Sequence, residues 1–348
     1  IGWCDWSSDV CSSDLEYTFA APKPDLVYRF TPYRPGEPLR PEARIIASVT
    51  EGLPPLKVQF ASAGDGRVAW DFGDGTTSQD PRPAHVFEKA GFYSVKLTVT
   101  DAQGNSAEAF QSIAVDRDAA EPLLRIGMPE GKETPGVKLH GTVRRAGNGA
   151  FLLPAGAPWG WVQVGDGAIE ELRGLRSFTV MGWLKPESLQ VGSGGNRILF
   201  CLKANRSGID LVCHSDGRLR LAVNEWPDSV RNDSSAGKLQ VGKWTFFAVS
   251  YDATAPGDNV SWYFSPPADT PGPSAVTLDR RTAYHAGPVD SDVGPPAIGN
   301  FNETMHGYGL DRQFRGEIGA VQVFGSRVSG RGALRLHEIN SRLSSLWS

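Results

Sequence analysis

Three stretches rich in Gly, Pro or Asn carry aromatic and amide side chains, around residues 159–161, 224–228 and 300–309. Sugar rings stack through their C–H groups on exposed aromatic faces, while amides or acids bind the hydroxyl groups. The candidate ligand contacts are therefore Trp159, Trp161, Trp226, Asn300, Asn302 and Tyr308. The competing interpretation is that each aromatic side chain fills a core or pins a loop.

The acidic and histidine residues lack the spacings that catalysis requires. Glycoside hydrolases place two carboxylates in one cleft, about 5 Å apart in retaining enzymes, and no strand here alternates carboxylates in that way. Glu170 and Glu171 are adjacent, so a strand would point them to opposite faces. The six histidines show no metal-ligand spacing, and no Gly-x-Ser-x-Gly motif or Gly-rich phosphate loop is present. The sequence predicts no catalytic centre.

Two stretches in the first half of the chain are predicted to form β-strands. Residues 70–75, Trp-Asp-Phe-Gly-Asp-Gly, run from an alternating strand into a hairpin dipeptide. Residues 93–101 alternate strictly with period 2 and end at a turn that contains Gly104. Together with residues 54–60 and 85–87, their order and spacing resemble a PKD domain at 41–117. The resemblance implies a non-catalytic immunoglobulin-like sandwich, used as a spacer or accessory module in secreted multi-domain proteins.

The second half of the chain carries many short strand signals and one helix signal, near residues 332–339. The strands are expected at residues 161–164, 177–184, 198–202, 209–213, 218–223, 244–251, 260–264 and 317–324. Eight or more short strands over this length require two stacked antiparallel sheets.

Three motifs of this half, residues 177–186, 242–252 and 314–324, resemble in their order a LamG-type, concanavalin A-like jelly roll. The resemblance implies binding of glycans or proteins, frequently with a bound calcium ion, and some relatives are glycoside hydrolases or polysaccharide lyases. The fold class expected for the chain is all-β, with an immunoglobulin-like β-sandwich followed by a jelly-roll sandwich.

A calcium site of that family is incomplete in this sequence. Gly319 stands where many members carry an acidic residue, and Ca²⁺ binds several oxygen donors. Asp166, Asp258 and Asp311 fit no known calcium loop and are interpreted as acids of surface turns. Ca²⁺ stays an open alternative as a cofactor, and no other cofactor is expected.

Cys201 and Cys213 are equidistant from Ser207, the middle of an apparent hairpin. A symmetric hairpin places the two cysteines opposite each other, where a disulfide can close. Such a bridge favours export to an oxidising compartment. Two buried thiols on neighbouring strands are the alternative.

Residues 5–15 resemble a translated sequencing adapter, so residues 1–15 are expected to be an artefact of assembly. A disordered polar N-terminus is the alternative. Without this segment and its three aspartates, the formal net charge changes from −4 to −1, which argues against a nucleic-acid partner. No apolar run approaches the roughly 20 residues of a membrane helix. An adapter at this place implies that the reading frame was cut there, so a signal peptide or an upstream domain is expected to be missing.

The sequence therefore predicts a fragment of a secreted or cell-surface multi-domain protein that acts as a non-catalytic carbohydrate-binding or adhesion module. The expected partner is a polysaccharide or glycoconjugate, with a cell-surface protein as the alternative. Two alternatives are the accessory part of a carbohydrate-active enzyme whose catalytic domain lay upstream, and a structural surface protein that contacts other proteins. The expected organisation is an artefact at 1–15, a Pro-rich linker at 16–40, the PKD-like domain at 41–117, a linker at 118–138 and the jelly roll at 139–348.

Overall fold

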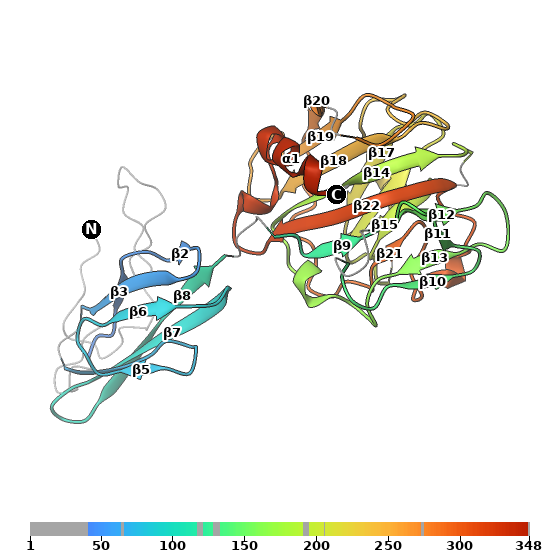
Figure 1. The fold of residues 1–348 in the computed structure, drawn as a ribbon. Helices are drawn as coiled ribbons and strands as arrows, with labels where there is room; N and C mark the ends of the chain where they lie inside the picture. The colour runs from blue at the N-terminus through green and yellow to red at the C-terminus, as the bar shows by residue number, and fades with distance from the viewer. Residues whose placement is uncertain are drawn as a thin grey trace, which may run out of the picture. The chain divides into compact units, whose positions relative to one another are not determined.

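The computed structural model describes residues 41–346, apart from 64–65, 117–120, 128–132, 191–194, 205 and 273–274. The expected adapter-derived segment and the Pro-rich linker, residues 1–40, lie outside the described residues. Strands dominate the described part, in which α1 (Leu336–Arg342) is the single α-helix, and the prediction of an all-β chain is confirmed (Figure 1). The short 3-10 helices are η1 (Glu170–Leu172), η2 (Pro227–Ser229), η3 (His306–Tyr308), η4 (Gly330–Gly332) and η5 (Leu343–Leu346).

Strands β1 to β8 form an immunoglobulin-like sandwich of two sheets, with the orders β1-β3-β6 and β2-β8-β7-β4-β5. The strands are β1 (Ile45–Ala47), β2 (Glu51–Gly52), β3 (Leu56–Ser62), β4 (Arg67–Asp71), β5 (Thr77–Ser78), β6 (Ala84–Phe87), β7 (Gly91–Thr100) and β8 (Ser106–Val115). The predicted hairpin joins β4 to β5. Gly75 takes a φ of +90° in its turn, a conformation that favours glycine.

Alternating apolar residues build the core of this sandwich. Val95, Leu97 and Val99 of β7 are buried, and the residues between them are more exposed. The Phe60 ring lies 5.6 Å from Trp70, measured between centroids. The indole N–H of Trp70 donates to the carbonyl of Asp80 at 3.0 Å, so the motif tryptophan is buried with its polar atom satisfied.

Strands β9 to β22 form a second sandwich. Its six-stranded sheet has the order β10-β13-β21-β15-β16-β17, and its eight-stranded sheet has the order β11-β12-β22-β14-β18-β19-β20, with β9 also paired to β22. The strands are β9 (Leu124–Ile126), β10 (Lys138–His140), β11 (Arg144–Arg145), β12 (Phe151–Leu153), β13 (Trp161–Gln163), β14 (Ser177–Pro186), β15 (Asn196–Phe200), β16 (Ile209–Cys213), β17 (Leu219–Val223), β18 (Thr245–Asp252), β19 (Val260–Phe264), β20 (Thr277–Thr282), β21 (Ala297–Ile298) and β22 (Gly316–Ser326).

The central strand β14 is buried on both faces. Val180 faces a core that is shared with the six-stranded sheet, whereas Trp183 faces a second apolar cluster that includes Ile339 of α1. Because both faces are covered, β14 is a nearly continuous apolar run, as parallel or central strands often are. The predicted helix is present but begins at Leu336, where Glu338 Oε2 accepts a hydrogen bond from the Arg335 amide.

The predicted disulfide between Cys201 and Cys213 is wrong, since both cysteines are free and buried. Lys203 pairs with Ser207, so the hairpin is centred two residues earlier than the sequence symmetry suggested. Cys213 then lies opposite Asn196, at the far end of β15 from Cys201. Five residues of extended strand span about 16 Å, well beyond the roughly 7 Å limit for a disulfide. Burial raises the pKa of both thiols to about 12.

Truncation of Phe60 is expected to destabilise the first sandwich strongly. Phe60 is fully buried and contacts both Trp70 and Phe72, so Phe60→Ala leaves a cavity that costs about 3–5 kcal/mol. Urea unfolding followed by far-UV circular dichroism measures the loss. Phe110 is 64% exposed, so Phe110→Ala is the control and changes stability by less than about 0.5 kcal/mol. Equal effects of the two variants would contradict this core.

Candidate functional site

Three of the six predicted binding residues meet around η3, which lies between β21 and β22. Trp161 belongs to β13, Trp226 immediately precedes η2, and Tyr308 ends η3. His306 at the start of η3 contacts Trp161, and Tyr308 contacts Trp226. We call His140, Trp161, Trp226, His306 and Tyr308 the η3 surface.

Tyr308 presents the most accessible aromatic ring of this surface. The residue is 55% exposed, and its ring centroid lies 5.6 Å from that of Trp226 at an interplanar angle of 60°. On its buried side, Trp226 packs against Phe301 and Phe200, with centroids 5.9 Å and 6.2 Å away. An exposed ring on a partly buried aromatic support suits stacking on a sugar.

Trp161 is packed between two imidazole rings. His140 lies opposite Trp161 in the β10–β13 pairing, and the two rings stack at 4.1 Å with an interplanar angle of 5°. The His306 ring lies 4.1 Å away at 72°. His140 Nε2 is also 2.9 Å from Gln163 Oε1. With His140 stacked on its indole, Trp161 holds η3 to the sheet instead of offering both faces to a ligand.

A buried ion pair lies beneath the aromatic cluster. Arg197 is 3.2 Å from Asp210, and the guanidinium carbon lies 4.5 Å from the Phe301 centroid and 5.7 Å from that of Trp226. A cation over aromatic faces is attracted by their quadrupoles, more strongly when it is desolvated. Burial outweighs the attraction of Arg197 and raises the pKa of Asp210 to about 6.

Asn300 and Asn302 lie in the loop that leads into η3, where their side chains bind the backbone. Both residues are buried. The Asn300 amide donates to the carbonyls of Gly160 and Leu310, at 3.1 and 2.7 Å. The Asn302 amide donates to the carbonyls of Leu202 and Pro295, at 3.0 and 2.9 Å. These amide donors hold the loop and are not presented to a ligand, which contradicts the role predicted for them.

Trp159 is also outside the η3 surface. Its ring lies 5.5 Å from the guanidinium of Arg315, in a separate cation–π contact. Conversely, His140 and Arg197 were not predicted from the sequence, and His306 was predicted only as part of the candidate loop 300–309. A predicted pairing of residues 138–140 with 161–163 would have placed His140 opposite Trp161, but three-residue strands carry little periodicity.

The structure gives the surroundings of three of the positions considered for calcium. A Cβ on Gly319 would lie 3.0 Å from Trp183 Cβ, so this position faces an apolar cluster and has no room for a carboxylate. Asp166 pairs with Lys138 at 2.6 Å, and Asp311 pairs with Arg312. Across the described residues, no group of three or more His, Cys, Asp or Glu side chains could hold a metal ion.

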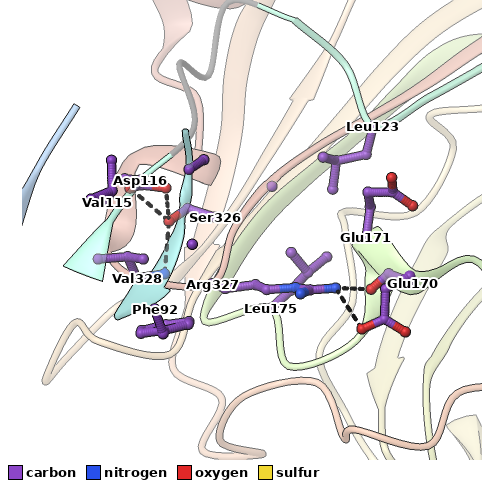
Figure 2. Close-up of a pocket in the computed structure, with 13 residues that line it drawn as sticks. Phe92, Val115, Asp116, Leu123, Glu170, Glu171, Leu175, Ser326, Arg327 and Val328 are labelled. Atoms are coloured by element: carbon purple, nitrogen blue, oxygen red, sulfur yellow. Dashed lines mark hydrogen bonds and ion pairs between the residues drawn. The ribbon is translucent and has the colours of Figure 1, made fainter. Parts of the chain in front are cut away.

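The adjacent acids Glu170 and Glu171 lie on η1 and not on a strand. Figure 2 shows Arg327, which follows β22, pointing to Glu170, while Glu171 points away from this pair. Arg327 Nη2 donates to the Glu170 carbonyl and lies 3.4 Å from its carboxylate. Arg173 lies 3.3 Å from the same carboxylate. Glu170 is therefore an ion-paired residue that anchors η1.

The described part of the chain contains no helix of sufficient length and apolarity to cross a membrane. It agrees with the sequence, which contains no apolar run of the length of a membrane helix.

Comparison with known proteins finds a family match in the first sandwich. Residues 38–115 match the model of the PKD domain family. Pre-pro-metalloprotease PrtV of Vibrio cholerae serotype O1 is 43% identical over 89 residues, covering 25% of this chain and 10% of that protein. The crystal structure of the PKD1 domain from that metalloprotease is 38% identical, with a TM-score of 0.20, and the match covers 22% of this chain and 98% of that one.

A carbohydrate-binding module from the β-sandwich superfamily is 16% identical, with a TM-score of 0.28, and the match covers 83% of this chain and 98% of that one. The chain spans about a tenth of the length of the curated protease that it matches.

We expect Asp210 to make stability depend on pH. Its pKa is about 6 in the folded protein against an ordinary 3.8, so the folded state binds the proton more tightly than the unfolded chain. This contribution is complete below about pH 3.8 and is lost as the pH rises through about 6. Relative to Asp210→Asn, the native protein therefore gains stability as the pH falls from 7 to 4, measured by urea unfolding.

The control is Asp258→Asn, because Asp258 is exposed in the loop before β19 and is not among the charges that shift the pKa of Asp210. Its pH profile is expected to parallel that of the native protein. Parallel profiles for the native protein and Asp210→Asn would show that Asp210 does not titrate as its burial demands.

Proposed function

Because residues 38–115 belong to the PKD domain family, we propose that this chain is a non-catalytic accessory part of a larger exported protein. Its second sandwich then binds a polysaccharide or glycoconjugate through the η3 surface. The match to one tenth of a metalloprotease supports the first part of the proposal, since the matched unit recurs inside a much longer protein.

The exposed Tyr308 ring on the Trp226 support carries the carbohydrate proposal. Both aromatic residues come from loops beside the same sheet, and exposed carboxylates of Glu303 and Asp311 lie in the loop that bears Tyr308. Acids beside an aromatic face accept hydrogen bonds from sugar hydroxyls while the ring stacks on the C–H groups. The rigid support lowers the ordering cost of binding.

We further propose that the second sandwich is of the LamG type. The three motifs behind this resemblance lie in β14, β18 and β22, which are neighbours in one sheet in the order β22-β14-β18. A shared sheet makes these motifs one structural unit. The proposed type still assigns no ligand by itself, because folds host many functions.

Two other functions remain as proposals of lower rank. The chain can be the accessory part of a carbohydrate-active enzyme whose catalytic domain lies elsewhere in the protein, or a surface protein that binds other proteins. The first shares the η3 surface as its sugar contact. The second is favoured only if the surface binds no glycan.

An extracellular location is proposed from the relative's name, which describes a pre-pro-protein. Because Cys201 and Cys213 are free thiols, no disulfide between them supports this location. The location therefore rests on the name of that relative alone.

Loss of the Tyr308 ring is expected to weaken glycan binding. The full chain is applied to a glycan array, and the affinity for the best glycan is measured by calorimetry for native protein and Tyr308→Ala. One lost stacking contact of about 1 kcal/mol lowers affinity roughly five-fold. Phe110→Ala removes an exposed ring from the first sandwich and leaves the affinity unchanged. Absence of binding to any glycan, or an unaltered Tyr308→Ala affinity, would refute the proposed site.

A further inference from the structure

Tyr308 and His306 belong to the same turn of backbone. The Tyr308 amide donates to the Met305 carbonyl at 3.1 Å, and the Gly309 amide donates to the His306 carbonyl at 2.9 Å. One end of η3 therefore carries the exposed ring, and the other end is held against Trp161 by an imidazole. A shift of His306 moves Tyr308, because His306, Gly307 and Tyr308 form the single hydrogen-bonded turn η3.

The surroundings of His306 suit the neutral imidazole. The ring hydrogen-bonds to the backbone of Phe301, while Nε2 is buried and has no hydrogen-bond partner among the described residues. The bond to Phe301 therefore uses Nδ1, and Nε2 is the atom that accepts the next proton. Protonation would bury a charged N–H group without an acceptor, which is costly.

The charged groups around His306 act in opposite directions. Burial lowers the pKa of His306, and the neighbouring His140 lowers it further. The carboxylate of Glu303, in the loop before η3, raises the same pKa but does not cancel the effect of burial. Lys138, on the strand that carries His140, is paired with Asp166 at 2.6 Å.

We propose that the stack of His140, Trp161 and His306 is a pH-sensitive clamp that sets the position of Tyr308, so that acid weakens binding at the η3 surface. The clamp is closed when His306 is neutral and opens when the imidazole takes up a proton. The ligand of this surface rests on the proposed function, whereas the clamp itself is a property of the ligand-free protein.

The direction of the effect follows from proton linkage. An open, solvated His306 titrates near its ordinary pKa of 6.5, and the closed clamp holds that pKa lower. Closure therefore releases a proton below about pH 6.5 and is unaffected by pH well above it. For a single proton the closing equilibrium weakens by at most about ten-fold for each pH unit in this range.

The clamp is tested first without a ligand. Full-length protein carrying ¹³C-labelled histidine and tyrosine rings is titrated from pH 8 to pH 5 by NMR. The Tyr308 ring signals are expected to move with the same midpoint as the His306 signals, below 6.5. In His306→Phe, which keeps a ring against Trp161 but cannot titrate, the Tyr308 signals stay constant. His306→Gln is a second non-titrating variant, and His337→Gln, on the exposed side of α1, behaves as the native protein.

Constant Tyr308 signals in the native protein, or signals that still move in both His306 variants, would overturn the clamp. With a glycan identified on the array, the native affinity is expected to fall about five-fold from pH 6.5 to pH 5.5, and that of His306→Phe less than two-fold. An equal fall in both proteins would also overturn the clamp. Coupled Tyr308 signals with no bound glycan would reject only the carbohydrate proposal.

Discussion

The central strand β14 must be covered on both of its faces. Its side chains are apolar almost without interruption, so exposure of either face would cost about 25 cal/mol for each Å² of apolar surface. The six-stranded sheet covers one face, and α1 with the residues after it covers the other. These two covers leave the outer face of the six-stranded sheet for loops, and the η3 surface is built there.

On that outer face a buried ion pair lies beneath aromatic rings. Asp210 and Phe200 are paired across β15 and β16, and Arg197 joins them beneath Trp226. A buried ion pair is weak evidence for stability, since apolar residues of similar volume often serve as well. Its value here lies in orientation, because the planar guanidinium fixes the rings of Phe301 and Trp226 around one charge. A loop held in this way can present Tyr308 with little loss of entropy.

The sequence was sufficient for the long strands and insufficient for the contacts between loops. Apolar runs such as 177–184 and 244–251 carry a strong periodic or continuous signal, and the corresponding strands β14 and β18 are present within two residues of their expected ends. The two-residue β21 carries no such signal. Asn300 and Asn302 were assigned to a ligand because their amides suit sugars, but an irregular loop needs the same donors for its own carbonyls. The error over Cys201 arose because equal spacing about Ser207 does not fix the centre of a hairpin, which the pairing of Lys203 with Ser207 sets.

The place of β22 in its sheet affects how the protein is made. This strand lies between β12 and β14, yet it follows every other described strand of its sheet in the chain, and α1 follows it. Domains generally fold from the N-terminus during synthesis. The first sandwich can therefore form early, while the second waits with an open gap in the middle of its larger sheet. Nascent chains with that gap expose strand edges and apolar surface, and they are the species most in need of a chaperone.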